Sequence, residues 1–276
     1  MEGSSERVVL MPDTASTNAL TEPTPLFWDV FFQVYEHLPR QGPGTRACAA
    51  QALALCNELP DAPKILDLGC GVGGQTLQLA ELTNGTIVAI DSHAPSIDRL
   101  QRSIDKRGLS KRVRALVGDM ANSLQPHESF DLIWSEGALY GVGLEVALNV
   151  CRTLLRPGGY LAFTDAIWRK ANPPAAVKAS FDLDYPGMGW LNDDLSMIQS
   201  AEFDLVGHFT LPDDAWWDDF YTPMEARISQ LRRRYAEDQE AMQVLDQIAQ
   251  EPEMHRLHAR YYAYEFFVVR RPLRVF

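Results

Sequence analysis

Glycines are concentrated in one stretch of the sequence, KILDLGCGVGGQ, which runs from Lys64 to Gln75. Gly69, Gly71 and Gly74 follow the spacing G-x-G-x-x-G, which lets the backbone approach a nucleotide-like cofactor closely. This pattern alone does not distinguish sites for NAD(P), FAD and other nucleosides. Asp67 precedes the first glycine by two residues, and a carboxylate there would repel a pyrophosphate but attract an ammonium or sulfonium group. The stretch therefore favours a cofactor that carries positive charge beside the loop.

Polar residues also follow the next three predicted strands, at the edge where open α/β sheets bind their ligands. Asp91 lies about 20 residues beyond the glycines and can accept hydrogen bonds from ribose hydroxyls, as acids do in NAD sites and S-adenosylmethionine sites alike. Asp119 can accept a hydrogen bond from an adenine amino group, and Met120 can pack on the ring. Ser135 and Glu136 end the following strand, at the rim of the same crevice.

These features, with the PGG turn at 157–159, resemble the class I, Rossmann-like S-adenosylmethionine-dependent methyltransferases that act on small molecules. The resemblance covers about residues 63–212 and the last strand. The segments RQGPGT, IWSEGA and YYAYEFF look like those of a group of small bacterial stand-alone methyltransferases.

The resemblance implies how the cofactor S-adenosylmethionine would be bound. Asp67 would face its ammonium group, Asp91 the ribose, and Asp119 with Met120 the adenine, while the RQGPG segment would close over its methionine end. The cofactor-binding residues implied in this way are Arg40, Gln41, Gly42, Gly44, Asp67, Gly69, Cys70, Gly71, Gln75, Asp91, Ser92, Asp119, Met120, Ser135 and Glu136.

Methyl transfer from a sulfonium is an in-line displacement, so the protein contributes mainly positioning and the exclusion of water. A base is needed only if the acceptor must lose a proton. The catalytic candidates are Glu136, Tyr140 and His37. Substrate contacts are expected from aromatic residues outside the minimal fold, namely Phe27, Tyr35, Trp216 and Trp217. The two tryptophans are flanked by carboxylates and could bind a cationic amine, although packing of one tryptophan in the core is the simpler interpretation, which we favour.

Short apolar strands alternate with amphipathic helices from residue 64 to residue 168, which predicts a parallel sheet with helices on both faces. The expected fold is therefore α/β, a seven-stranded, mostly parallel Rossmann-like sheet with an antiparallel last strand and helical lid elements. We expect a flexible leader (1–24) and a single methyltransferase domain (25–276). Its expected parts are cap helices (25–60), a cofactor-binding core (61–168) and substrate or lid insertions (169–190 and 213–261), of which 169–190 is Pro-rich and irregular.

Composition limits the partners. The chain has 276 residues and a formal net charge of −12, which disfavours nucleic acid as a partner. Its four cysteines are far apart in the sequence, which disfavours a zinc site and a disulfide scaffold. No apolar run is long enough to span a bilayer, and no signal peptide is recognised, so we expect a cytoplasmic enzyme with a small-molecule acceptor. The aromatic helix near residue 25 could be a lid or the face of a homodimer.

Other functions remain open. A protein could bind S-adenosylmethionine without transferring its methyl group. An NAD(P)-dependent oxidoreductase would need a pair such as Tyr-x-x-x-Lys, but Tyr140 is followed four residues later by Leu144. Arsenic methylation would need converging cysteines, a pattern that is missing. The choice between N-, O-, S- and C-methylation is not determined.

Overall fold

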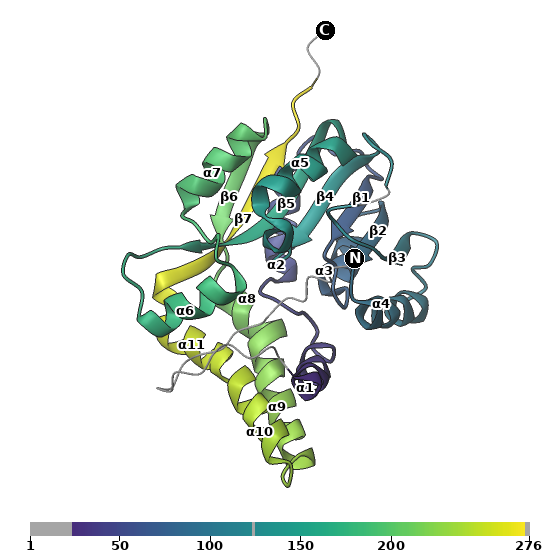
Figure 1. Ribbon diagram of the computed structural model, residues 1–276. Coiled ribbons are helices and arrows are strands. Elements are labelled where there is room, and N and C mark those ends of the chain that lie inside the picture. Colours follow the sequence, from purple (N-terminus) through teal and green to yellow (C-terminus); the bar gives the residue numbers. More distant parts are fainter. Residues whose placement is uncertain (1–23, 123–124, 274–276) are drawn as a thin grey trace, which may run out of the picture.

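The computed structural model describes residues 24–122 and 125–273, which include a seven-stranded sheet with the order β3-β2-β1-β4-β5-β7-β6 (Figure 1). Strands β1 to β5 pair in parallel, and β7 is antiparallel to both β5 and β6. The predicted fold class, including the antiparallel last strand, is confirmed. The strands are β1 (Lys64–Leu68), β2 (Thr86–Asp91), β3 (Val113–Val117), β4 (Phe130–Glu136), β5 (Leu155–Trp168), β6 (Asp204–Thr210) and β7 (Tyr262–Arg270).

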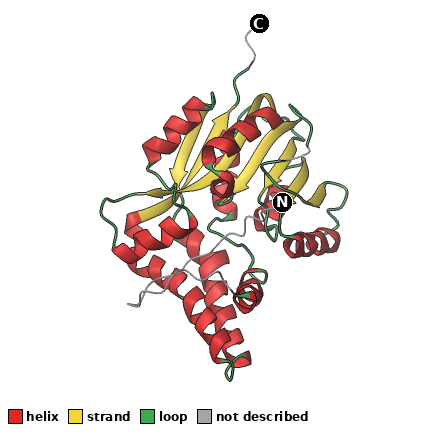
Figure 2. Cartoon of the chain, in the orientation of Figure 1, coloured by secondary structure: helices red, strands yellow, loops and turns green. Residues whose placement is uncertain are grey.

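Helices cover both faces of the sheet (Figure 2). One apolar core joins the sheet to α2, α3 and α4, and a second joins its other face to α5 and α7. The helical elements are α1 (Pro25–Tyr35), α2 (Arg46–Leu55), α3 (Gly74–Leu82), α4 (Ala94–Lys106), η1 (Leu139–Val142), α5 (Leu144–Leu154), α6 (Ala175–Asp184), α7 (Leu191–Ser200), α8 (Asp214–Trp216), η2 (Trp217–Tyr221), α9 (Thr222–Arg234), α10 (Gln239–Ile248), α11 (Gln250–His258) and η3 (Ala259–Tyr261).

The central strands are apolar because they are covered on both faces, as expected of a parallel sheet. In β1, every residue after Lys64 is buried. The chain leaves β1 through a glycine turn whose backbone N–H groups at Gly69 and Cys70 both donate to the carbonyl of Ile90, at 2.9 and 3.0 Å. Gly69 has φ +70°, a left-handed conformation that glycine adopts at no steric cost. The turn therefore fixes the start of α3 against the end of β2.

A third core lies outside the sheet, in the helices between β6 and β7. Since β6 runs parallel to β5, this insertion projects from the carboxyl ends of the parallel strands, and it occupies the lower half of Figure 1. Helix α1 belongs to the same core, where Phe27, Val30 and Val34 are buried. The apolar face of α1 is thus covered by the chain's own helices, and a homodimer remains a prediction.

Two segments differ from the expectation. The segment 169–190, predicted to be irregular, contains α6, because the Ala- and Lys-containing run after Pro174 favours a helix once it packs on the third core through Val177. Strand β5 begins at Leu155 and runs through the PGG turn.

Thr24 caps α1 by accepting a hydrogen bond from Phe27 N at 3.2 Å, and the rest of the predicted leader lies outside the described residues. No helix within the described ranges is long and apolar enough to cross a membrane.

Candidate cofactor site

A cavity of about 220 Å³ lies at the carboxyl ends of β1 to β4. The loops that follow these four strands form most of its wall. Arg40, Gln41 and Gly42, in the segment between α1 and α2, form another part of it. Its lining residues are Arg40, Gln41, Gly42, Gly69, Cys70, Gly71, Val72, Gly74, Gln75, Ile90, Asp91, Ser92, Gly118, Asp119, Met120, Glu136, Gly137 and Ala138.

Asp91 organises the floor of this cavity. Its carboxylate accepts hydrogen bonds from the backbone N–H of Gly71 and of His93, both at 2.8 Å. The end of β2 is therefore bound to the glycine loop after β1. Glycine is required at two positions of that loop, since a Cβ on Gly69 would lie 2.2 Å from the Cβ of Ala138 and one on Gly71 would lie 2.3 Å from Oε1 of Gln41.

The wall formed by the turn after β3 is more open to solvent. Asp119 is exposed and accepts hydrogen bonds from Ala121 N and Asn122 Nδ2, both at 2.9 Å. These bonds hold the turn after β3 at the cavity wall. The methyl group of Met120 lies close to Gly69, since a Cβ added to Gly69 would be 3.3 Å from it. An apolar side chain therefore faces the glycine loop on this side.

Asp67 lies beneath the cavity and does not line it. Its side chain is fully buried and accepts hydrogen bonds from Thr76 Oγ1 at 2.5 Å and from Gln75 Nε2 at 3.5 Å. Burial raises the pKa of Asp67 to about 7, although both hydrogen bonds oppose that shift. Gln75 also donates to the carbonyl of Gly69, at 3.3 Å, so it is the residue through which Asp67 is linked to the cavity.

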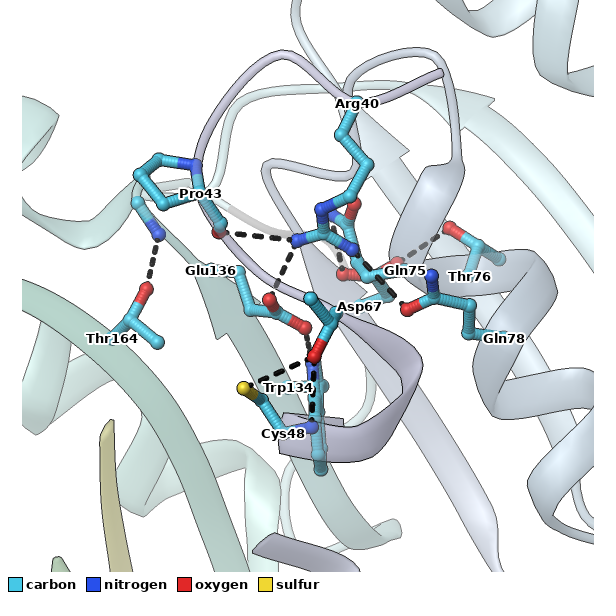
Figure 3. A network of polar contacts seen from close by, with 12 residues as sticks. Arg40, Pro43, Cys48, Asp67, Gln75, Thr76, Gln78, Trp134, Glu136 and Thr164 are labelled. Carbon is cyan, nitrogen blue, oxygen red and sulfur yellow. Dashed lines mark hydrogen bonds and ion pairs between the residues drawn. The ribbon is translucent and has the colours of Figure 1, made fainter. Parts of the chain in front are cut away.

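An ion pair crosses the end of the cavity nearest β4 (Figure 3). Arg40 Nη2 lies 2.6 Å from Glu136 Oε2, and the two side chains are only 4% and 2% exposed. Glu136 Oε1 accepts a second hydrogen bond, from Trp134 Nε1 at 2.7 Å. The guanidinium also donates to Gln78 Oε1 at 3.3 Å, while its Nε, which is buried, has no hydrogen-bond partner among the described residues.

The segment that carries Arg40 is tied to the glycine loop. Gln41 Oε1 accepts a hydrogen bond from Val72 N at 3.1 Å. Gly44 does not line the cavity; instead its missing side chain leaves room for the ion pair, because a Cβ there would lie 2.4 Å from both Arg40 Nη2 and Glu136 Oε2. Gly44 therefore supports the site through packing.

Most of the predicted cofactor residues converge on the cavity. Twelve of the fifteen line it, and the exceptions are Asp67, Gly44 and Ser135. Ser135 was expected at the rim, but it is fully buried and donates to the carbonyl of Leu68 at 2.8 Å. Successive side chains along a strand point to opposite faces of the sheet, so Ser135 is turned away from the cavity that Glu136 lines. The prediction that Ser135 lies at the rim was therefore wrong.

Of the catalytic candidates, only Glu136 lines the cavity. His37 is exposed just beyond α1 and is not part of the cavity wall. Tyr140 lies in η1, where its hydroxyl donates to Asp184 Oδ2 at 3.4 Å and its ring lies 5.0 Å from that of Tyr185. It packs against the third core, on the side of α6.

The four residues expected to contact substrate lie in the helical insertion and α1. Phe27 and Trp216 are buried in the third core, and Trp216 stacks on His255 with ring centroids 4.2 Å apart. Trp217 faces an outer pocket, where the guanidinium carbon of Arg256 lies 4.8 Å from its ring centre. The favoured interpretation, that a tryptophan packs in the core, holds for Trp216. Tyr35 donates to Glu251 Oε2 at 2.5 Å.

Several lining residues were not among those expected to bind the cofactor, namely Val72, Ile90, Gly118, Gly137 and Ala138. Each lies in or beside a motif segment, so position next to a motif was the available signal. Gly74, the third glycine of the motif, also lines the cavity. Within the described ranges, no group of three His, Cys, Asp or Glu side chains could hold a metal ion.

Comparison with known proteins agrees with this geometry. Residues 65–159 match the family described as "Methyltransferase domain". A sterol 24-C-methyltransferase of Pneumocystis carinii is 32% identical over 40% of this chain and 29% of its own length. A dimethylglycine N-methyltransferase of Parasynechococcus marenigrum is 33% identical over 41% of each chain. This chain thus spans less than half the length of either relative.

A solved structure shares the fold over most of the chain. The S-adenosylmethionine-dependent methyltransferase of Thiobacillus denitrificans, in complex with S-adenosylhomocysteine, superposes with a TM-score of 0.74 and 21% identity, over 87% of this chain and 97% of that chain. Residues 65–159 therefore match a methyltransferase family, and the chain shares its Rossmann-like fold with a methyltransferase of known structure, as the resemblance in sequence implied.

Proposed function

We propose that this chain transfers a methyl group from S-adenosylmethionine to a small-molecule acceptor. The observation that carries the proposal is the cavity, in which a glycine turn, an Asp91 carboxylate bound to that turn and the Asp119–Met120 pair converge at the carboxyl ends of parallel strands. Relatives in sequence are named as methyltransferases of sterols and of dimethylglycine, which supports transfer but leaves the acceptor open.

We propose that particular lining residues hold each group of the cofactor. Asp91 would hold the ribose hydroxyls, and Asp119 with Met120 the adenine. Arg40 has a buried Nε without a described partner, which is suited to a carboxylate and would hold that of the methionine moiety. Gly69 and Gly71 keep the loop in this position, since a Cβ on either would collide with the side chain of Ala138 or Gln41.

When bound, S-adenosylmethionine supplies an activated methyl group on a sulfonium. The chain's own contribution is position and the exclusion of water. Glu136 is held by Arg40 and Trp134, so we propose that it shapes the end of the cavity and holds Arg40, while Tyr140 is the better candidate to contact the acceptor. His37, at the surface, has no place in this scheme.

We also propose the division into cap helices (25–60), cofactor core (61–168) and insertions (169–190 and 213–261). All four cysteines are buried and free, which is compatible with a reducing compartment and supports a cytoplasmic location.

Titration calorimetry with S-adenosylhomocysteine tests the proposal. We expect the wild type to bind S-adenosylhomocysteine. In Asp91→Ala the affinity should fall at least tenfold, because the two proposed hydrogen bonds from the ribose hydroxyls to the carboxylate are removed, each worth about 1.5–3 kcal/mol. Asp98→Ala, which removes an exposed carboxylate from α4, is the matched control and should bind as the wild type does.

Binding of NADH without S-adenosylhomocysteine would refute the proposal. Binding of S-adenosylhomocysteine with no product formed from a broad panel of amines, alcohols, thiols and sterols would instead support the alternative, a protein that binds the cofactor without transferring its methyl group.

A further inference from the structure

The acid of the glycine motif does not reach the cavity itself. Asp67 is fully buried, and its two carboxylate oxygens accept hydrogen bonds from the side chains of Thr76 and Gln75 (Figure 3). Gln75, in contrast, lines the cavity. The route by hydrogen bonds from Asp67 to the cavity wall therefore runs through the side chain of Gln75.

The side-chain amide of Gln75 is held in one orientation. Its Nε2 lies 3.3 Å from the backbone carbonyl oxygen of Gly69 and 3.5 Å from Asp67 Oδ1. The carbonyl can only accept a hydrogen bond, and so can the carboxylate when it is ionised, so the amide nitrogen is turned toward them. Oε1 of Gln75 has no hydrogen-bond partner among the described residues. It is therefore an unused acceptor on a residue of the cavity wall.

Gln75 lies close to Arg40, the residue proposed above to hold the carboxylate of the methionine moiety. A Cβ on Gly74, which precedes Gln75, would be 2.7 Å from Arg40 Cγ. Gln78, in the same helix α3, accepts a hydrogen bond from Arg40 Nη1 at 3.3 Å. The ammonium and the carboxylate of an α-amino acid are bound to the same carbon atom. A carboxylate at Arg40 would therefore place the ammonium near the first turn of α3, which contains Gln75.

The charges of the cavity wall favour a positive group at this end. The described lining residues include three carboxylates, on Asp91, Asp119 and Glu136, and one guanidinium, on Arg40, which is paired with Glu136. Hydrogen bonds that follow one another also polarise each other. The bond from its amide nitrogen to a carboxylate therefore makes the Gln75 oxygen a stronger acceptor for a cation.

We propose that Oε1 of Gln75 accepts a hydrogen bond from the ammonium of the cofactor's methionine moiety, and that Asp67 is a positioning residue for Gln75. Asp67 would hold the amide with its oxygen toward the cavity. This inference rests on the proposed methyltransferase function, and it replaces the expectation that Asp67 itself faces the ammonium. The site would then select ligands that carry an amino group, although the side chain in contact with that group is uncharged.

Calorimetry with two matched ligands tests the proposal. One is S-adenosylhomocysteine, and the other is its deamino analogue, in which a hydrogen atom replaces the amino group and the nucleoside, sulfur and carboxylate are kept. We expect the wild type to bind S-adenosylhomocysteine at least tenfold more tightly, because the analogue lacks a hydrogen bond from a charged donor. The ratio of the two dissociation constants measures the contribution of the amino group.

Variants locate the contact. Gln75→Met keeps the length of the side chain and removes the acceptor, so the ratio should fall to within threefold of one, mainly through weaker binding of S-adenosylhomocysteine. Asp67→Asn should lower the ratio at least threefold, because an asparagine can present an amide nitrogen to Gln75 and let its amide turn. Gln199→Met, at an exposed position of α7, is the control and should leave both constants within twofold.

Urea unfolding shows whether each variant is folded, and if Gln75→Met is not, the ratio in Asp67→Asn decides. The proposal is overturned if the wild type binds both ligands equally well. It is also overturned if Gln75→Met weakens both by the same factor, which would indicate a merely structural role in the glycine loop. An unchanged ratio in Asp67→Asn would overturn the role of Asp67. Failure of the proposed function is a different result, since the wild type would then bind neither ligand.

Discussion

The buried pair of Arg40 and Glu136 gives a prediction whose magnitude follows from its burial. In Arg40→Met the aliphatic part of the side chain is kept and the charge is removed. Glu136 would then remain almost fully buried, with only Trp134 Nε1 as a described donor. Removing one member of a buried ion pair costs about 3–5 kcal/mol, because an uncompensated charge stays in a low-dielectric site. We expect the free energy of unfolding to fall by that amount.

Urea unfolding at pH 7 measures this change in Arg40→Met, Glu136→Gln and the double variant. The double variant should lose about 2 kcal/mol less than the sum of the single losses, since neither charge is then left alone. A loss below about 1 kcal/mol in Arg40→Met, or strictly additive losses in the cycle, would show that the pair is solvated and contradict the reasoning.

Three further predictions concern the glycine turn, the buried acid and the outer tryptophan. Gly69→Ala places a Cβ 2.2 Å from Ala138 at φ +70°, so it should weaken S-adenosylhomocysteine binding at least tenfold in calorimetry; unchanged affinity would contradict this. Burial raises the pKa of Asp67 to about 7, against about 3.9 in an unfolded chain, so the folded state retains a proton that the unfolded state releases. Between pH 4 and pH 7 the wild type should therefore lose up to about 4 kcal/mol of unfolding free energy relative to Asp67→Asn, and parallel pH profiles in urea unfolding would exclude the effect. Trp217→Ala should change the dissociation constants for amines and for the cofactor by less than twofold, because its ring faces Arg256 in an outer pocket. A tenfold loss of amine affinity would show instead that Trp217 contacts the acceptor.

The core of the fold could be predicted because its signals are local. Ile65, Leu66 and Leu68 mark a strand that is covered on both faces. Gly108, two residues beyond α4, has φ +67°, the left-handed conformation in which helices commonly end. The helix α6 could not be found in this way. Its ten residues become a stable helix mainly through packing on distant parts of the chain.

The site shows the same division between local and distant information. Asp91 ends β2 and Met120 lies just after β3. The carboxyl ends of parallel strands meet at one edge, so the convergence of these two residues on the cavity was predictable. Ser135 was placed wrongly at the rim, since side-chain direction depends on the neighbouring elements. His37, a catalytic candidate, is exposed outside the cavity wall. Nothing in the sequence joins Tyr35 to Glu251, 216 positions later, because that contact exists only once α1 lies on the helical insertion.

The segment 39–45 between α1 and α2 is fastened on two sides. Gln41 accepts a hydrogen bond from Val72 in the glycine loop, and Gly44 N donates to the carbonyl of Ala215 in the helical insertion, at 2.8 Å. In the proposed function, a nucleoside bound beneath this segment would leave only after both attachments loosen. We therefore expect exchange of spent for fresh cofactor to require movement of the covering helices, a kind of step that sets the turnover rate of many enzymes.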